Sequence, residues 1–216
     1  VSTFGLSVSS QLSNREWLES TKSSGMALGL GNTRAILSSL DIKLDDTTVI
    51  HVAGSNGKGT LCSLLATSIT LNGDSNIFFS SPHLCRIEER VRVNGVPVSP
   101  NQFDGALNTV RGAAKQLSIN PTFFETTFLT AMVIAADLQP RYLILETGLG
   151  GRLDATRCAP ADLAVLTAIT EEHTDILGED IYQIIREKAA IARPGKPLIA
   201  RKMPIKNYEN TVVNYT

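Results

Sequence analysis

The segment HVAGSNGKGT, residues 51–60, contains the residue types of a phosphate-binding loop. Its glycines allow successive backbone N–H groups to turn toward one anion. Lys58 could reach the outer phosphates of a nucleotide, and Thr60 offers a hydroxyl to a magnesium ion. The spacing departs from the standard G-x-x-x-x-G-K-[ST] pattern, because Val52 stands at the first glycine position and Gly59 follows the lysine. The segment therefore predicts a nucleotide site between a strand and a helix, with a ligand-free glycine turn as the alternative.

Polar side chains also follow three other apolar runs of the chain. Ser81 comes after NIFF, Glu146 ends YLILE, and His173 follows LAVLTAITEE. In open α/β sheets, ligands bind outside the carboxyl ends of the strands, so we expect these side chains and the glycine loop to face one crevice. An acidic residue beside a phosphate loop commonly holds magnesium. The alternatives are a plain turn at Ser81, a solvated strand end at Glu146, and a helix cap or surface histidine at His173.

Lys188 lies inside the apolar stripe of a helix predicted over residues 180–192. It stands four residues after Ile184 and three after Ile185, which places all three on one helical face. A lysine in that position must extend its amine to water, pair with an anion or lose its charge. We therefore expect either a snorkelling side chain or a lysine held in the site, in the latter case as a chemically modified ligand.

A second glycine-rich loop, GLGGRLDATR, spans residues 148–157. Its glycines permit tight backbone turns beside a ligand. The Asp154 carboxylate could pair with the N–H edge of a heterocycle, and the alternative is a bond to Arg152 or a turn cap. Phe123 and Phe124 begin an apolar helix, where such rings are usually core residues but can stack on a ligand.

The remaining pattern alternates predicted strands and helices. This alternation predicts an α/β fold with a mostly parallel, doubly wound sheet and a phosphate loop. Continuous apolar runs suit strands buried on both faces, and RVNGVPV at 92–98 predicts a hairpin with an Asn-Gly turn. The predicted strands span 48–53, 76–79, 142–146, 163–169 and 196–200, and the predicted helices span 15–20, 33–40, 60–71, 101–118, 123–137 and 180–192. After Arg201 the pattern ends, which predicts a linker or frayed end over 201–216.

The composition limits the function classes. The chain has 216 residues, of which 43% are hydrophobic and 19% charged, and a net charge of −1. The length and composition suit one globular domain, and the near-zero net charge gives nucleic-acid binding little electrostatic support. The sequence contains no apolar run of membrane-spanning length. The three scattered cysteines predict a reduced, cytoplasmic protein.

Six motifs together resemble the folylpolyglutamate synthase and dihydrofolate synthase family, within the Mur ligase superfamily. The resemblance covers roughly residues 25–200 and is closest to the bifunctional bacterial enzymes. The motifs occur in the family's order: HVAGSNGKGT, SSPHLCRIEERVRVNG, FFETTFLTA, LILETGLGGRLDAT, HTDILG and REKAAI. A Mur-type ligase of cell-wall synthesis and a non-catalytic nucleotide-binding domain are the alternatives.

The resemblance implies a reaction in which ATP phosphorylates a carboxylate of dihydropteroate or a reduced folate. The amine of L-glutamate then displaces phosphate and forms an amide. ATP and two magnesium ions are the implied cofactors, and the implied enzyme is a cytoplasmic monomer. Such enzymes continue into a smaller C-terminal domain that this chain does not supply, so we expect residues 1–200 to form the ATP- and pterin-binding domain and the isolated chain to turn over poorly.

The resemblance also assigns site residues. The implied catalytic residues are Lys188, His173 and Glu146, with Lys188 matching a lysine that is carbamylated by carbon dioxide. Glu172 replaces the family's usual aspartate before the histidine. The loop around 22–31 is expected to close over the pterin. The implied phosphate-binding residues are Gly54, Ser55, Asn56, Gly57, Lys58, Gly59 and Thr60; the metal ligands are Ser81, Glu146, His173 and Lys188; the pterin-site residues are Thr122, Phe123, Phe124, Glu125, Leu153, Asp154 and Ala155.

Overall fold

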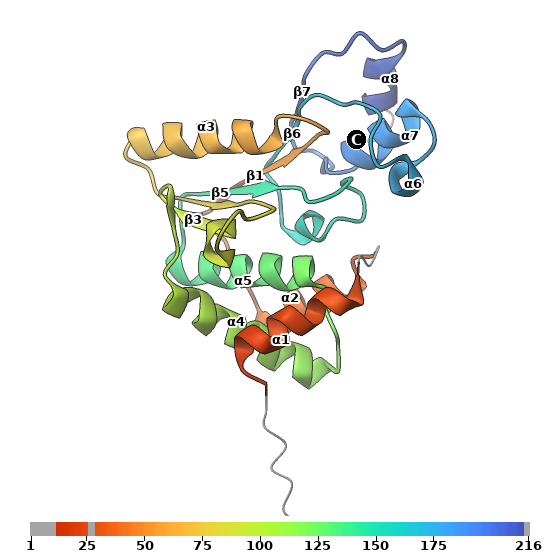
Figure 1. Ribbon diagram of the computed structural model, residues 1–216. Helices are drawn as coiled ribbons and strands as arrows, with labels where there is room; N and C mark the ends of the chain where they lie inside the picture. Colours follow the sequence, from red (N-terminus) through yellow and green to blue (C-terminus); the bar gives the residue numbers. More distant parts are fainter. Residues whose placement is uncertain (1–11, 26–28, 214–216) are drawn as a thin grey trace, which may run out of the picture.

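The computed structural model describes residues 12–25 and 29–213, and its centre is a seven-stranded sheet (Figure 1). The strand order is β4-β3-β2-β5-β1-β6-β7. The five strands from β2 to β7 along this order are parallel, and β3 and β4 add an antiparallel edge. This arrangement confirms the predicted mostly parallel α/β sheet. The strands are β1 Thr48–Ala53, β2 Asn76–Phe79, β3 Val91–Val93, β4 Val96–Pro97, β5 Tyr142–Glu146, β6 Leu163–Leu166 and β7 Leu198–Ala200.

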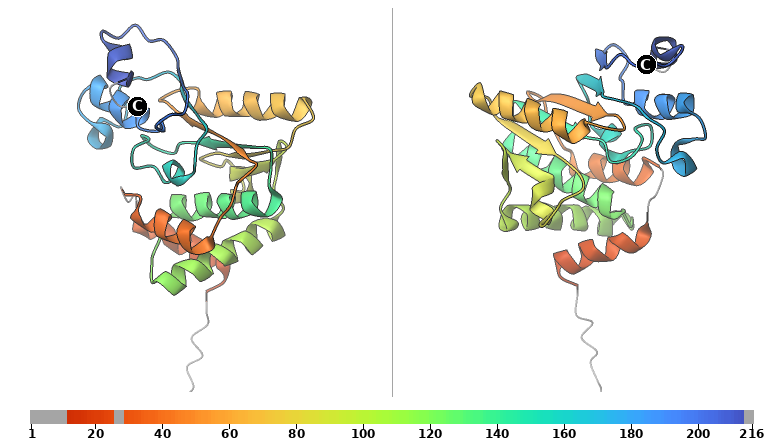
Figure 2. Two further views of the ribbon diagram at one scale, coloured as in Figure 1. Left: turned by 180° about the vertical axis from the view of Figure 1, so that it is seen from behind. Right: turned by 45° about the horizontal axis from the view of Figure 1, so that its top comes forward.

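Helices cover both faces of the sheet (Figures 1 and 2). Helix α3 lies on one face, and α5 lies on the other with α4, α2 and α1 outside it. Alternating β1 residues fill the two cores, because Val49 packs in the cluster that contains α5 and Ile50 in the cluster that contains α3. These helices are α1 Asn14–Ser20, α2 Gly31–Leu40, α3 Lys58–Leu71, α4 Pro100–Leu117 and α5 Phe123–Leu138.

The helices that follow β6 gather at one end of the sheet, next to the carboxyl end of the chain (Figure 1). Helix α7 was predicted and is slightly shorter than expected. Helices α6 and α8 were not predicted, and α8 corrects the expectation of a frayed end after Arg201, because Tyr208 and Val212 are buried in the same apolar cluster as α7. The three helices are α6 Thr174–Leu177, α7 Ile181–Ala189 and α8 Tyr208–Val213.

Local sequence signals explain several boundaries. The hairpin β3–β4 turns at Asn94 and Gly95, which both have positive φ, as the Asn-Gly pair predicts. Helix α3 begins at Lys58 rather than Thr60, so the phosphate-loop lysine is already helical. Three 3₁₀ helices connect other elements: η1 Thr21–Ser24, η2 Ile87–Arg90 and η3 Ala155–Cys158.

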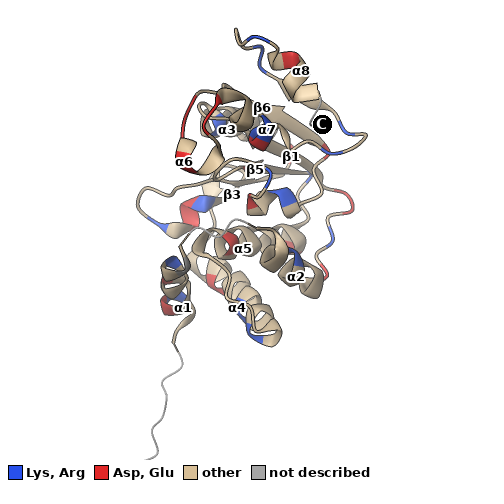
Figure 3. Ribbon diagram, turned by 90° about the vertical axis from the view of Figure 1, so that its right-hand side faces the viewer, with Lys and Arg blue, Asp and Glu red and all other residues tan. Residues whose placement is uncertain are grey.

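The surface carries mixed charge. Figure 3 shows Lys and Arg interspersed with Asp and Glu along the helices and loops that face the viewer. Within the described ranges, no helix is both long and apolar enough to cross a membrane.

Candidate functional site

The glycine loop leaves the carboxyl end of β1 and is held by the segment after β6. The Ser55 N–H donates to the Ala168 carbonyl at 2.7 Å, and Asn56 forms an isolated bridge with Ala168. The Ser55 hydroxyl accepts the Thr170 N–H at 3.0 Å. These contacts fix the loop against the segment that directly follows β6, so the neighbouring strand sets the position of the loop.

Lys58 stands in the first turn of α3 and folds back over the loop. Its Nζ donates to the carbonyls of Gly54 at 2.9 Å and Ser55 at 3.2 Å. The N-cap residue Gly57 has φ +85° and provides no side-chain cap to the helix. The first N–H groups of a helix favour an anion, and an ammonium beside them adds to that preference. The loop thus has the geometry of a phosphate site.

Gly54 is required by its surroundings. Its φ is +148°, and a Cβ at this position would overlap the Thr167 hydroxyl and lie 3.2 Å from the Ala168 carbonyl. A side chain at position 54 would therefore push the loop away from the segment after β6.

We expect Gly54→Ala to lower the free energy of unfolding by about 2 kcal/mol or more, because overpacking adds to an unfavourable φ. Chemical denaturation of both proteins measures this difference. Gly112 is the matched control, because it lies in α4 with nothing within 4 Å of an added Cβ. Gly112→Ala should raise stability by up to about 1 kcal/mol. Equal stability of Gly54→Ala and the wild type would show that the loop does not need a glycine here.

Gly59 lies beside the carboxylate of Glu146, which the strand β5 carries to the same edge. A Cβ at position 59 would lie 3.2 Å from Glu146 Oε1, tighter than most side-chain contacts. The Ser81 N–H donates to Glu146 Oε2 at 3.4 Å. Burial raises the pKa of Glu146, while the Ser81 N–H and Lys58 oppose the change. The glycine after the lysine therefore makes room for Glu146, which gives a physical reason for the departure from the standard motif.

Lys188 is buried and paired. Its side chain is 2% exposed, and Nζ donates to Glu172 Oε1 at 2.9 Å and to the Gly54 carbonyl at 3.2 Å. This burial excludes the snorkelling alternative. Burial lowers the pKa of Lys188, and the Glu172 carboxylate partly opposes that change. Burial would raise the pKa of Glu172, but the ammonium of Lys188 holds it below its ordinary value.

The glycine loop, Lys58 and Lys188 line one small polar cavity of about 180 Å³. His173 and Glu172 line the same cavity, so the predicted convergence of the loop with the segment after β6 is present. His173 is the N-cap residue of α6 by position, but its side chain makes no cap hydrogen bond. Glu146 lies beside Gly59 and accepts the Ser81 N–H, but neither Glu146 nor Ser81 lines this small cavity.

Two of the predicted metal ligands, Ser81 and Glu146, have oxygen atoms suited to a hard cation. The Glu146 carboxylate and the Ser81 hydroxyl are oxygen ligands of the kind that magnesium prefers. Within residues 12–25 and 29–213, no group of three or more His, Cys, Asp or Glu side chains is placed to hold a metal ion. The predicted set contains only two residues of these types, Glu146 and His173, so phosphate oxygens of a nucleotide would have to complete the coordination.

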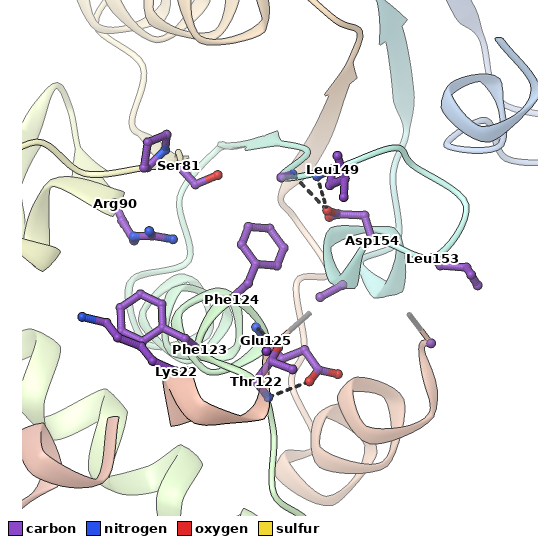
Figure 4. A pocket seen from close by; sticks show the side chains of 15 residues that line it. Lys22, Ser81, Arg90, Thr122, Phe123, Phe124, Glu125, Leu149, Leu153 and Asp154 are labelled. Atoms are coloured by element: carbon purple, nitrogen blue, oxygen red, sulfur yellow. Dashed lines mark hydrogen bonds between the residues drawn. The ribbon is translucent and has the colours of Figure 1, made fainter. Parts of the chain in front are cut away.

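A larger cavity of about 400 Å³ (Figure 4) shares Gly148 and Leu149 with the small one, so the two adjoin. All seven residues predicted for the pterin site line it, and so does Ser81. In Figure 4, Phe124 lies between Arg90 with Phe123 on one side and Asp154 on the other. The loop expected to close over this cavity contributes Lys22, Gly25 and Gly29, while residues 26–28 of that loop lie outside the described residues.

Asp154 holds the second glycine loop together. Its Oδ2 accepts the N–H groups of Gly148 at 2.9 Å and Leu149 at 3.0 Å, and its Oδ1 accepts the N–H and hydroxyl of Thr156. Burial raises the pKa of Asp154, and these hydrogen bonds oppose the change. The turn-cap alternative is therefore correct, while Arg152 pairs with Glu187 instead. A ligand would meet a carboxylate that the loop has already oriented.

Thr122 and Glu125 also serve the fold at the cavity wall. They form a capping box at the start of α5, with the Thr122 N–H on Glu125 Oε2 at 2.8 Å. Glu125 Oε1 accepts the Thr33 hydroxyl at 2.9 Å. Their polar atoms fix the α5 terminus, which places Phe123 and Phe124 at the cavity.

Sequence reasoning missed His51, which lies on β1 within the quoted loop motif. His51 is fully buried, and its Nε2 is 2.8 Å from the Thr156 hydroxyl. Burial lowers its pKa to about 3, with Arg193 and Arg157 adding to the effect. His51 thus connects β1 to Thr156 and, through it, to Asp154; the apolar run around it gave no signal of this contact.

A parallel sheet with a glycine loop and a lysine between β1 and α3 places the protein in the phosphate-loop class of α/β folds. No family model matches the chain. Its curated relatives include the dihydrofolate synthase/folylpolyglutamate synthase of Escherichia coli, which is 40% identical over 183 residues, 85% of this chain and 43% of the relative. The E. coli FolC structure in complex with DHPP and ADP matches with a TM-score of 0.86 and 36% identity, over 94% of this chain and 49% of that one.

A further solved structure agrees with these matches. A bifunctional folylpolyglutamate synthase/dihydrofolate synthase with Mn, AMPPNP and L-glutamate bound has a TM-score of 0.83 and 34% identity, over 95% of this chain and 50% of that chain. The chain belongs to the dihydrofolate synthase/folylpolyglutamate synthase family. It spans about half the length of the relatives that it matches.

Proposed function

We propose that the protein joins L-glutamate to dihydropteroate or a reduced folate, using ATP and an acyl phosphate. The observation that carries this proposal is the pair of adjoining cavities that share Gly148 and Leu149. One is polar and is lined by the phosphate loop and two lysines, and the other combines aromatic and apolar side chains with a few charged ones. A nucleotide and an aromatic acid would meet at this boundary.

The relatives support the choice of substrates. The matched FolC binds DHPP and ADP, and the second matched enzyme binds Mn, AMPPNP and L-glutamate. Residues 1–200 would form the ATP- and pterin-binding domain, and the glutamate-binding part would lie in the half of the relatives that this chain does not match. The protein would act as a cytoplasmic monomer.

The reaction would proceed in two steps. A carboxylate oxygen of the pterin acid attacks the γ-phosphorus of ATP, and ADP leaves. The uncharged amine of glutamate then attacks the acyl carbon, phosphate leaves, and the amine loses its proton. Lys58 and the N–H groups of the loop would hold the phosphates and stabilise their negative charge during transfer. Phe124 and the Asp154 loop would orient the pterin end.

Ser81 and Glu146 would hold one magnesium ion, and His173 with Lys188 would face a second. Bound magnesium would neutralise phosphate charge. Glu146 fits this role because its carboxylate lies beside the start of α3, where nucleotide phosphates would bind. Burial raises the pKa of Glu146, and a cation bound beside it would stabilise the ionised carboxylate.

Lys188 would act as a carbamate. The neutral amine adds to carbon dioxide and releases a proton, which converts a cation into an anionic oxygen ligand. Burial favours the neutral amine that this step needs. Carbamylation would also release Glu172 from its ion pair with Lys188, so the two side chains would then face the site as separate anions.

Glutamate-dependent ATP hydrolysis by the full-length protein tests this function. ADP should accumulate over repeated turnovers only when both L-glutamate and a pterin acid are present, because the first step alone releases at most one ADP per enzyme; dihydropteroate and tetrahydrofolate are compared at equal concentration. ADP formation that needs neither compound would refute the ligase proposal.

A further inference from the structure

His51 is a buried side chain that the proposed reaction does not use. It lies in β1 between Leu145 of β5 and Ala164 of β6, and is fully buried. Its Nε2 lies 2.8 Å from the Thr156 hydroxyl, while its Nδ1 is buried without a hydrogen-bond partner among the described residues. A buried polar atom without a partner is costly, so an apolar side chain would suit this strand better unless the ring serves another purpose.

The hydrogen bonds around Thr156 define the direction in which His51 acts. The Thr156 hydroxyl donates to Asp154 Oδ1. A hydroxyl has one hydrogen, so His51 Nε2 must carry the hydrogen of its own contact and donate it to the Thr156 oxygen. Burial, with Arg157 and Arg193 adding to the effect, lowers the pKa of His51 to about 3, so the ring is neutral and has a single N–H. A chain of two hydrogen bonds therefore runs from β1 through Thr156 to the Asp154 carboxylate.

Strand β1 holds the second glycine loop at both ends. At the start of the loop, the N–H and the hydroxyl of Thr147 donate to the Val52 carbonyl. At the end of the loop, His51 holds Thr156 by the contact described above. Neighbouring residues of one strand therefore determine where the loop begins and where it ends.

The boundary between the two cavities depends on Asp154. Its Oδ2 accepts the N–H groups of Gly148 and Leu149, the two residues that both cavities share (Figure 4). A Cβ at Gly148 would lie 2.6 Å from a ring carbon of Phe124 and 3.2 Å from Asp154 Oδ2. Gly148 is thus closely packed between the ring and the carboxylate, and a rotation of Asp154 would displace the boundary.

We propose that His51 is a positioning residue of the ligase reaction, which acts through Thr156 and Asp154. It holds the boundary in the place where the pterin acid meets the nucleotide, so this inference rests on the proposed function. The phosphate loop continues from the same strand but is held by its own contacts to the segment after β6. Loss of the His51 donor should therefore weaken binding of the pterin acid and leave binding of the nucleotide unchanged.

Separate calorimetric titrations of the full-length protein with the two ligands test this role. His51→Leu keeps a buried side chain of similar size but removes the donor. It should weaken binding of dihydropteroate, in the presence of saturating AMPPNP and magnesium, by about 3- to 10-fold, because one hydrogen bond is lost. It should leave the affinity for AMPPNP unchanged. His51→Gln returns an N–H donor to the place of Nε2, and should bind dihydropteroate nearly as the wild type does.

Variants at Thr156 show whether the effect passes along the proposed chain. Thr156→Val removes the hydroxyl and should weaken dihydropteroate binding at least as much as His51→Leu, whereas Thr156→Ser keeps the hydroxyl and should not. The double variant His51→Leu/Thr156→Val should lose no more affinity than Thr156→Val alone, because the two residues act in one chain. Thr130→Val is the matched control and should change neither affinity. It removes another fully buried hydroxyl, which donates to the Thr126 carbonyl and lines neither cavity.

The outcomes separate this role from a purely structural one and from the function on which it rests. Equal weakening of dihydropteroate and AMPPNP by His51→Leu, or a loss that His51→Gln does not restore, would overturn the positioning role and leave the ligase proposal intact. Additive losses in the double variant would overturn the chain through Thr156. If His51→Leu does not fold, unchanged dihydropteroate binding in Thr156→Val would overturn the role in the same way. A wild-type protein that binds AMPPNP but no dihydropteroate would overturn both the role and the proposed function.

Discussion

Replacing Lys58 with alanine is expected to weaken binding of the non-hydrolysable analogue AMPPNP, with magnesium, by about 100-fold or more. Lys58 Nζ lies 2.9 Å from the Gly54 carbonyl, at the centre of the loop that would surround the phosphates. The substitution removes one positive charge and up to two charge-assisted hydrogen bonds, each worth about 1.5–3 kcal/mol. Calorimetric titration measures the dissociation constant directly.

The control for Lys58→Ala distinguishes loss of the positive charge at the loop from the same change in the net charge of the protein. Lys115 is exposed near the end of α4, so Lys115→Ala changes the net charge equally and should bind AMPPNP as the wild type does. Thermal melting without nucleotide should show that Lys58→Ala still folds, because its lost contacts are only to loop carbonyls. Unchanged AMPPNP affinity in a folded Lys58→Ala protein would remove the phosphate-loop assignment.

Replacing Lys188 is expected to abolish ligase activity, with a decrease in kcat of about 100-fold or more. The residue is buried beside the loop, where the carbamate would supply a ligand that no neighbouring side chain can replace. Lys188→Ala leaves space for a small anion, so added formate or acetate should restore part of the activity. Lys188→Met keeps most of the volume but removes the amine, and the same anions should not restore it.

Steady-state kinetics of the full-length protein, with bicarbonate varied, checks this expectation. Lys196 is an exposed lysine paired with Asp162, and Lys196→Ala should keep wild-type kcat. Wild-type kcat in Lys188→Ala would contradict any role in catalysis. A large loss that small carboxylates restore equally in Lys188→Ala and Lys188→Met would instead contradict the carbamate, because the anion would then act away from position 188.

The strand pattern and the buried lysine were predictable because both are local patterns with a packing consequence. Apolar runs such as YLILE can be buried on both faces only in the centre of a sheet. The position of Lys188 among isoleucines predicted either a snorkelling side chain or a lysine held in the site, and its burial in the structure decides for the second. Helix α8 was missed because it is short and its sequence shows no clear helical pattern. Tyr208 and Val212 become buried only through tertiary contacts with the cluster around α7.

The parts of the site that depend on tertiary contacts could not be predicted. Asp154 could have bound a ligand, paired with Arg152 or capped a turn, and only the folded loop shows that its oxygens accept backbone N–H groups. Arg90 stands in a charged run, EERVR, which normally indicates a solvated surface. Its neighbours along the chain gave no sign that Glu88 and Glu89 would be engaged elsewhere, which leaves Arg90 without a carboxylate partner among the described residues.

In the proposed reaction, the acid's carboxylate attacks ATP across the boundary between the two cavities. Isotope transfer tests it most directly. Dihydropteroate labelled with ¹⁸O in both carboxylate oxygens is supplied with ATP and L-glutamate to the full-length protein, and the released phosphate is examined by mass spectrometry. We expect one ¹⁸O atom in each phosphate, because the attacking carboxylate oxygen stays with phosphorus when glutamate displaces the phosphate. Phosphate released without the label, while the amide product forms, would contradict the account.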